Sequence, residues 1–177
     1  MSLARHPMLR FIGLGALLYL AWHLLYEFVL KPHTALDEVV ATHLVNGSTW
    51  ILELLGYEVM DAATCARPNS LGIAGAKCLQ VGAPCDGVVL FALFTCFIIA
   101  FPGPWKKRLW YIPFGLVLIH LSNLTRIASL VLILYYNPEY LDFNHDYTFT
   151  IFVYAVIFAL WYGWVGRGTL NHADNYA

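Results

Sequence analysis

The sequence has 177 residues, of which 60% are hydrophobic, 16% are aromatic and only 12% are charged, and its formal net charge is −1. Soluble domains carry about 25% charged residues, and a chain of this length cannot bury so much apolar surface in one core, so lipid must cover the rest. The near-neutral charge and the lack of an extended basic patch argue against a nucleic-acid partner. The composition therefore predicts an integral membrane protein in a lipid bilayer.

Four apolar stretches are predicted to be membrane-spanning helices, for which about 20 mostly apolar residues are needed. The first has a longer apolar region than a signal peptide and no nearby A-x-A-like cleavage site, so we expect it to be retained. The predicted fold is an all-α integral membrane protein that forms one membrane domain over residues 1–177. The four predicted spans cover residues 8–30, 86–101, 110–136 and 147–165, and the second ends at the Pro-Gly-Pro sequence of residues 102–104.

Positive charges in the short connecting segments set the predicted orientation of the helices. Arg5 and Arg10 precede the first span, residues 106–108 (Lys-Lys-Arg) lie between the second and third, and Arg167 follows the fourth. All three groups lie on one side of the membrane only if both termini are cytoplasmic. We therefore expect a multi-pass protein of the cytoplasmic (inner) membrane. The segments that then face outward are residues 31–84 and 137–146.

The longer outward-facing segment is predicted to form a helix followed by a small hairpin-like cap. Residues 34–55 carry apolar side chains at nearly helical spacing, Thr34 with Asp37 resembles a capping box, and Gly56 suits the C-terminal end. This amphipathic helix either lies on the outer leaflet or packs against the spans, and the sequence leaves both open. Residues 57–81 contain the turn signals of the cap.

Two of the four cysteines, Cys65 and Cys78, lie in this cap, on the oxidising side of the membrane where disulfides persist. We predict that they pair with each other, which leaves Cys85 as a free thiol. Cys96 lies about 16 Å further along the second helix at about 1.5 Å per residue, so we interpret it as a small apolar residue.

The third predicted span carries a polar stripe around an ionisable residue. Arg126 lies ten residues, about 15 Å, from the outer end of this span, where a charge is costly and usually functional. Ser122, Asn123 and Ser129 have the spacing that places them on the same helix face. The alternative is a structural arginine paired with an acid, although no acid is buried in another predicted span.

A cysteine and a histidine are predicted at the outer ends of the second and fourth spans. Taken singly, Cys85 is a small residue at a helix start or half of a disulfide, and His145 is a solvated loop residue. Asn144 and Asp146 flank the histidine, and a hydrogen bond to it would fix its tautomer. Together, Cys85, His145 and Arg126 supply a nucleophile, a base and an oxyanion donor, which are the parts that acyl transfer needs.

Three short motifs that contain these residues resemble the signature blocks of the exosortase/archaeosortase family. They are CDG at residues 85–87, NLTRI at 123–127 and NHD at 144–146, in family order and at matching helix positions. The resemblance extends over about residues 56–165 and implies a compact version of the family's catalytic core, because larger members have extra membrane helices. It implies a cysteine protease or transpeptidase that cleaves the C-terminal transmembrane sorting signals of exported proteins. The new carboxyl end would pass through a thioester to a lipid or sugar acceptor at the cell surface.

The resemblance also implies a role for individual residues. Cys85 corresponds to the nucleophile, His145 to the general acid/base and Arg126 to the transition-state stabiliser. Asp86 stands where the family usually has a small residue, and a carboxylate there disfavours the thiolate unless it turns to Arg126 or another cation. Phe149 stands where the family often has glycine. These departures concern efficiency and substrate class more than the type of reaction.

The predicted positions leave a difference in depth within the membrane. Arg126 lies well below the helix ends that carry Cys85 and His145, and snorkelling of its side chain closes only part of the gap. We therefore expect either a tilted third span or a site sunk into the outer leaflet, with a water-filled cavity. In such a cavity Asn123 would be a second donor to the oxyanion.

Two other functions stay open on the residues alone. A membrane thiol–disulfide oxidoreductase would use several cysteines, but the sequence has no C-x-x-C motif. A non-enzymatic assembly or scaffold protein would tolerate replacement of Cys85. We expect no metal and no cofactor, because the seven histidines are scattered without H-x-x-x-H or H-E-x-x-H spacing. Several acidic residues show no pairing that indicates catalysis, namely Glu27, Asp37, Glu38, Glu53, Glu58 and Asp61.

Overall fold

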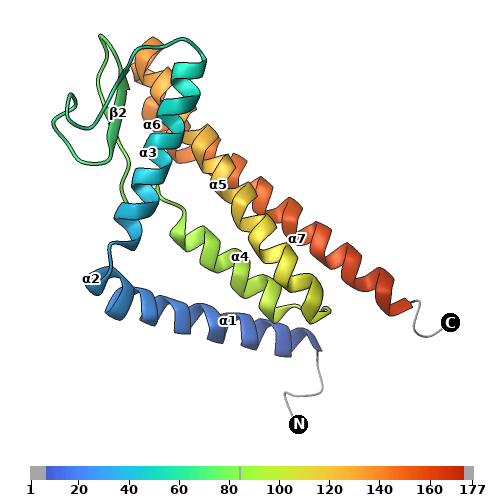
Figure 1. Cartoon of the computed structure of the whole chain (residues 1–177). Helices are drawn as coiled ribbons and strands as arrows, with labels where there is room; N and C mark the ends of the chain where they lie inside the picture. The colour runs from blue at the N-terminus through green and yellow to red at the C-terminus, as the bar shows by residue number, and fades with distance from the viewer. Residues whose placement is uncertain (1–6, 84, 174–177) are drawn as a thin grey trace. The chain divides into compact units, whose positions relative to one another are not determined.

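The computed structural model describes residues 7–83 and 85–173, and the protein is mostly helical (Figure 1). The described residues form two compact units, one from residues 7–34, 89–118 and 156–173 and the other from residues 35–83, 85–88 and 119–155. In chain order, the elements are α1 (Pro7–Leu25), the π-helical turn η2 (Tyr26–Leu30), α2 (Lys31–His33), α3 (Leu36–Leu54), β1 (Val59–Met60), β2 (Ser70–Ile73), β3 (Leu79–Gln80), α4 (Val88–Ala100), α5 (Trp105–Tyr136), the 3₁₀ turn η3 (Pro138–Tyr140), α6 (Leu141–Phe143), the π-helical turn η4 (Asn144–Thr148) and α7 (Phe149–Ala173).

Three helical segments of the described chain are long and apolar enough to cross a membrane, so the chain is a multi-pass membrane protein. They are Met8–His33, Trp105–Tyr136 and Pro138–Gly166. Helix α4 has 13 residues, which is shorter than the roughly 20 residues that a span needs. The second predicted span is therefore helical over Val88–Ala100 only, and the count of four spans stays a prediction.

The helical segments that contain the third and fourth predicted spans begin earlier than the sequence predicted, because helical structure extends into the polar residues before each span. Helix α5 begins at Trp105 rather than residue 110, so the Lys-Lys-Arg sequence of residues 106–108 lies in its first turn. Residues 137–146 were expected to form a loop before a helix at 147. The chain is instead helical again from Pro138, a residue that suits the first turn of a helix.

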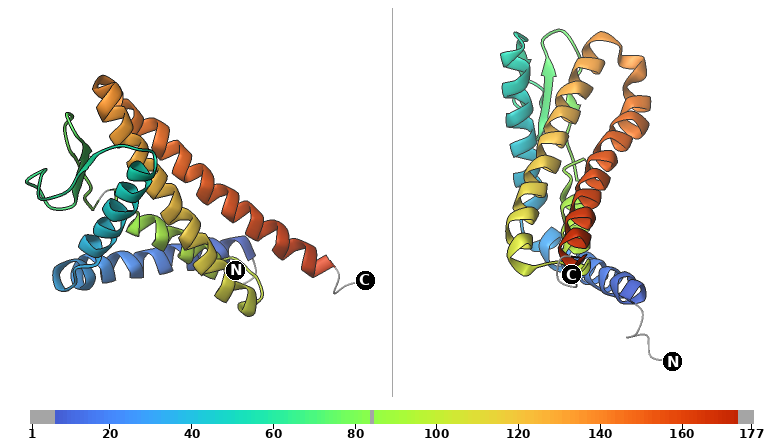
Figure 2. Two further views of the ribbon diagram at one scale, coloured as in Figure 1. Left: turned by 45° about the horizontal axis from the view of Figure 1, so that its top comes forward. Right: turned by 90° about the vertical axis from the view of Figure 1, so that its right-hand side faces the viewer.

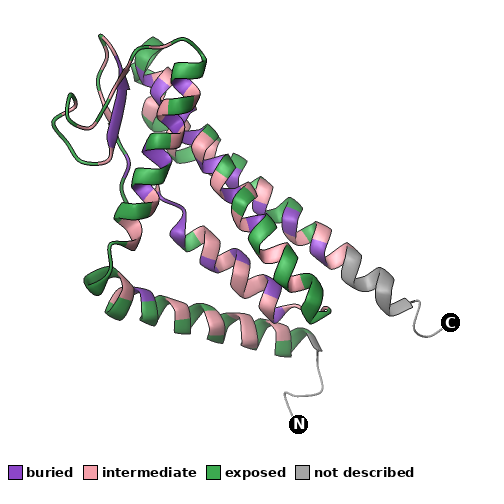
Figure 3. Ribbon diagram, in the orientation of Figure 1, coloured by how far each residue is buried: buried purple, intermediate pink, exposed green. Residues whose placement is uncertain are grey.

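The second unit contains a three-stranded antiparallel sheet within the segment predicted as a hairpin-like cap. β2 is the central strand and pairs with β1 on one edge and β3 on the other. All four residues of β2 are buried (Figure 3). A disulfide joins Cys65 and Cys78, which lie in the two connections that flank β2. The cross-link ties these connections together although β1 and β3 have only two residues each.

Helix α3 packs its apolar face against protein. Leu44 and Leu52 of α3 are fully buried in one cluster with Leu71 of β2 and with Ile127 and Val131 of α5. Both views of Figure 2 show α3 and the sheet beside this part of α5. Full burial of such side chains contributes about 1.5–3 kcal/mol each. Of the two placements that the sequence left open for this helix, the packed one is therefore observed.

The two ends of α3 differ in how well they were predicted. The capping box was wrong, because Ala35 is the N-cap residue and no side chain caps the helix. The Thr34 hydroxyl instead donates to the Leu30 carbonyl at 2.6 Å, and so belongs to the end of the preceding helix. The C-terminal end is confirmed, since Gly56 follows the helix with a φ of +88°.

The helices of the first unit pack largely through aromatic rings. The Phe97 ring of α4 lies 5.3 Å from that of Phe11 on α1 and 4.3 Å from that of Trp161 on α7, measured between centroids. Helix α1 is mostly exposed along its length (Figure 3). In a membrane, that exposed apolar surface would be covered by lipid.

Candidate active site

Cys85 lies in the short segment before α4, where local hydrogen bonds fix the backbone. Its N–H donates to the Gly82 carbonyl at 2.7 Å, and Asp86 Oδ1 accepts from the Val88 N–H at 2.9 Å. An aspartate that binds the N–H two residues further on forms an Asx turn, and this turn leads into α4. The CDG sequence therefore presents a half-buried thiol at the start of a helix.

Gly87 lets this segment dock closely on α5. Its φ is +84°, a conformation that favours glycine, and a Cβ at this position would collide with the side-chain amide of Asn123. Asn123 is fully buried, and its Nδ2 donates to the Asp86 carbonyl at 3.4 Å. One N–H of this amide is thus occupied in holding the cysteine segment, and the role of Asn123 as a second oxyanion donor stays a prediction.

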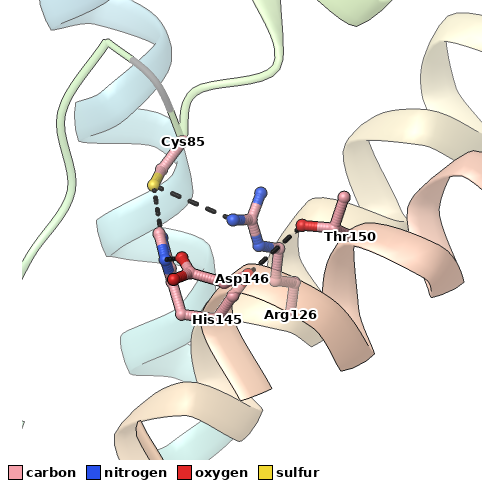
Figure 4. A network of polar contacts seen from close by, with 5 residues as sticks. All are labelled: Cys85, Arg126, His145, Asp146 and Thr150. Atoms are coloured by element: carbon pink, nitrogen blue, oxygen red, sulfur yellow. Dashed lines mark hydrogen bonds and ion pairs between the residues drawn. The ribbon is translucent and has the colours of Figure 1, made fainter. Parts of the chain in front are cut away.

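His145 contacts the thiol from the π-helical turn η4. Its Nε2 lies 3.1 Å from Cys85 Sγ, and its Nδ1 lies 2.9 Å from Asp146 Oδ1 (Figure 4). If Nδ1 donates to the carboxylate, Nε2 is the nitrogen free to accept the thiol proton. Thr150 Oγ1 donates to the His145 carbonyl at 3.2 Å, which gives this carbonyl a partner in the irregular turn. Single π turns inside helices are frequent at functional sites.

Arg126 completes the cluster from α5. It is 8% exposed, and its Nη2 lies 3.9 Å from Cys85 Sγ (Figure 4). Its Nε is buried without a hydrogen-bond partner among the described residues. Ser122 and Asn123 are buried on the same stretch of helix, as the spacing predicted, and Ser129 is half-buried.

Among the described residues, no acid forms an ion pair with Arg126. Ion pairs in the described chain include Lys31–Glu27 and His145–Asp146, and neither involves the arginine. The alternative of a structural arginine held by an acid is therefore not observed. A guanidinium buried without a carboxylate keeps its charge available for an anion that forms during a reaction.

The predicted difference in depth disappears because the chain turns back as a helix. His145 comes nine positions after Tyr136, and Arg126 comes ten positions before it. Since helical structure resumes at Pro138, the histidine returns along the bundle to the level of the arginine instead of staying in an outer loop. The water-filled cavity around Arg126 stays a prediction.

The electrostatics of the site disfavour a resting thiolate. Burial raises the pKa of the Cys85 thiol, the Arg126 charge opposes this rise, and the charges of Asp86 and Asp146 add to it. A protonated thiol needs a base within hydrogen-bond reach before it can attack. Among the described residues, the imidazole of His145 is in that position.

Asp86 faces a second carboxyl group rather than the arginine. Asp86 is 1% exposed, and burial raises the pKa of its carboxyl to about 7. The hydrogen bond from the Val88 N–H lowers this pKa. The charge of Asp37 and a hydrogen bond with Asp37 raise it. Two carboxyls in contact at a buried position favour sharing a proton. The suggestion that Asp86 turns to Arg126 is therefore wrong, whereas its influence on the thiol is present.

Some predicted residues lie outside the cluster, and others were missed. The Asn144 amide donates to the Tyr140 carbonyl at 2.9 Å, a contact within the helix turn rather than with the thiol. Asp37 was set aside because the sequence showed no pairing for it that indicates catalysis, and its partner Asp86 lies 49 positions away. Thr150 carries no motif that would have marked it. No group of three potential metal ligands occurs among the described residues.

The sequence model of the transmembrane exosortase family matches residues 6–163. The probable archaeosortase D of Methanocaldococcus jannaschii is 29% identical over 125 residues, which cover 66% of this chain and 79% of that protein. No solved structure matches the chain significantly.

Proposed function

The chain belongs to the transmembrane exosortase family, as its motifs predicted, and we propose that it is a membrane-embedded cysteine transpeptidase. Its substrates would be exported proteins with a C-terminal sorting signal that includes an apolar helix. Cleavage would leave the exported protein as a thioester on Cys85, ready for transfer to a lipid or sugar acceptor.

The first half of the reaction forms the thioester. His145 Nε2 takes the proton from Cys85 as the sulfur attacks the carbonyl carbon of the scissile peptide bond. The new C–S bond places negative charge on the carbonyl oxygen, and the Arg126 guanidinium stabilises that oxyanion. When the C–N bond breaks, His145 returns the proton to the leaving amine, which departs with the apolar helix of the sorting signal.

The second half releases the product. An acceptor hydroxyl, amine or water attacks the thioester while His145 Nε2 accepts its proton. The C–S bond then breaks, and the sulfur regains a proton from the imidazolium. Asp146 stabilises the imidazolium through the Nδ1 contact at 2.9 Å in both halves.

The single observation that carries this proposal is the arrangement around one sulfur atom. Three motifs separated by up to 60 positions place an imidazole nitrogen 3.1 Å and a guanidinium nitrogen 3.9 Å from Cys85 Sγ. A disulfide elsewhere occupies Cys65 and Cys78, so this thiol is free to react. The oxidoreductase alternative has less support, because no second free thiol accompanies Cys85 within unit Ala35–Val88 and Ile119–Ala155.

The proposed orientation places both termini in the cytoplasm and the site on the outer side. The positive groups at Arg10 and at residues 106–108 support this orientation, since such groups concentrate on the cytoplasmic side. Arg5 and Arg167, which also entered the prediction, lie where the structure describes no side chains.

The test is to trap the thioester. The purified protein in detergent is incubated with exported proteins of the same cell that end in an apolar helix and a basic tail, and intact mass spectrometry detects an acyl adduct. We expect the adduct in the native protein and in C96A, which removes the other free thiol, and none in C85A. Native-rate processing by Cys85→Ser in membranes would overturn the proposal.

A further inference from the structure

A cavity in the first unit is separate from the thiol site. It lies between the first turns of α5 and the later part of α7, and its volume is about 500 Å³. This is within the range of about 300–1,000 Å³ that is typical of small-molecule sites. Its lining is almost wholly apolar and aromatic apart from two lysines, and it includes Lys106, Lys107, Trp110, Tyr111, Phe114 and Trp164.

The aromatic wall of this cavity is held in place by its own contacts. The Tyr111 hydroxyl donates to the Leu160 carbonyl at 2.6 Å, and the Tyr111 ring lies 5.0 Å from that of Trp164, between centroids. Trp164 in turn packs on Gly103, where a Cβ would come within 2.7 Å of its ring. The wall is therefore preformed, which lowers the entropic cost of binding a ligand.

The two lysines at the cavity have no acidic partner in the part of the chain that the structure describes. Both side chains belong to exposed residues, neither forms an ion pair within the described chain, and the first turn of α5 contains no acid. The neighbouring Arg108 is already engaged, because its Nη2 donates to the Phe101 carbonyl at 3.0 Å and its guanidinium lies over the Trp105 ring. Two cations without an ion-pair partner among the described residues thus lie beside an apolar cavity.

We propose that this cavity binds an anionic phospholipid, with its phosphate on Lys106 and Lys107 and an acyl chain along the aromatic wall. A small soluble anion would leave the apolar wall without contacts, and a purely apolar ligand would leave the charges of the two lysines without a counter-charge. Trp105 and Trp110 are 62% and 83% exposed, and exposed tryptophans next to lysines mark the membrane interface. On the proposed orientation this is the cytoplasmic leaflet, which is rich in anionic lipids.

Lipid retention by the full chain tests this site. The protein is purified in detergent and titrated with phosphatidylglycerol or phosphatidylcholine of identical acyl chains, and native mass spectrometry counts the bound lipids. We expect about 25-fold preference for phosphatidylglycerol, and we expect the double variant K106Q/K107Q to lose it, since each of the two basic residues near an anionic headgroup contributes about a fivefold gain. W110A should weaken binding of both lipids by removing part of the wall.

Matched variants separate a built site from general attraction. K77Q removes an exposed lysine from the sheet region of the other unit, and W50A removes a tryptophan that is 63% exposed there. Both should retain the native preference. Equal retention of the two lipids by the native protein would overturn the proposal, as would an unchanged preference in K106Q/K107Q. Because neither lysine touches the thiol site, these outcomes do not depend on activity at Cys85.

Discussion

The two compact units treat polar side chains in opposite ways. Every buried polar or charged residue found in the described chain lies in the second unit, whereas the first unit is packed through stacked aromatic rings. A buried polar side chain costs roughly 1–3 kcal/mol unless it finds a hydrogen-bond partner. The concentration of such side chains in the second unit is expected if the chemistry resides there and the first unit serves the membrane. The residues concerned are Ser48, Ser70, Asp86, Ser122, Asn123 and Arg126.

The largest difference should appear when one arginine of each unit is replaced in turn by glutamine and the two rates of substrate processing are compared. Arg126→Gln removes the cation beside Cys85 Sγ, and we expect processing to fall by about 10²–10³, the range for loss of one oxyanion donor. Arg108→Gln removes a cation that donates to the Phe101 carbonyl and lies over the Trp105 ring, and should change the rate less than twofold. The rates are measured on a co-expressed exported protein by the appearance of its shortened form.

Folding has to be checked alongside these rates. Arg126→Lys keeps the charge in the buried position, so partial recovery of the rate would assign the loss to charge rather than to unfolding. A fall of similar size in Arg108→Gln would break the proposed division between the units.

The second prediction concerns the pH dependence of stability. Burial raises the pKa of Asp86 to about 7 from its ordinary 3.8, so between about pH 4 and 7 the folded protein binds more protons than the unfolded chain. The free energy of unfolding should therefore fall as pH rises through this window, by about 4 kcal/mol at most. Asp86→Asn keeps the group neutral, so its stability should be close to native at pH 4 and higher than native at pH 8.

An aspartate with the opposite shift is the control. Hydrogen bonds from Thr64 hold the pKa of Asp61 below its ordinary value, so its contribution is lost as pH falls rather than as it rises. Asp61→Asn should leave the loss of stability between pH 4 and 7 intact. Denaturant unfolding at a series of pH values measures both, and an unchanged slope in Asp86→Asn would show that this carboxyl is not the source.

The third prediction compares two glycines that share a positive φ. Gly56 has a φ of +88° with nothing within 4 Å of an added Cβ, so Gly56→Ala should cost only the backbone strain, about 1–2 kcal/mol. Gly87 has a φ of +84°, and an added Cβ would also meet the Asn123 amide, so Gly87→Ala should cost at least about 1 kcal/mol more. Thermal unfolding ranks the two, and equal melting temperatures would contradict the close docking of the cysteine segment.

The sequence predicted the helical class, the disulfide and, through the three motifs, the residues that meet at the thiol. Each of these predictions depends on local or compositional signals. Hydropathy could not reveal that Pro138 restarts a helix, since residues 137–146 are polar enough to read as a loop, and this placed His145 too far outward. The contact of Asp37 with Asp86 was also out of reach. It joins segments 49 positions apart and depends on how α3 packs, which no periodicity encodes.

The smallest effect, and the last comparison between the units, concerns the two free thiols. Because burial raises the pKa of Cys85 above its ordinary 9.0, its alkylation by iodoacetamide should be slow at pH 7 and should accelerate beyond pH 9. Asp86→Asn removes a charge that raises this pKa and should speed alkylation severalfold, whereas Arg126→Gln should slow it. Neither change should affect Cys96, which lies in α4 within the first unit. Mass spectrometry of C96A and C85A assigns each rate to one sulfur. A fast, pH-independent reaction of Cys85 would mean that the proton already rests on His145, so the imidazole would act as a permanent ion-pair partner rather than as a base that takes the proton during attack.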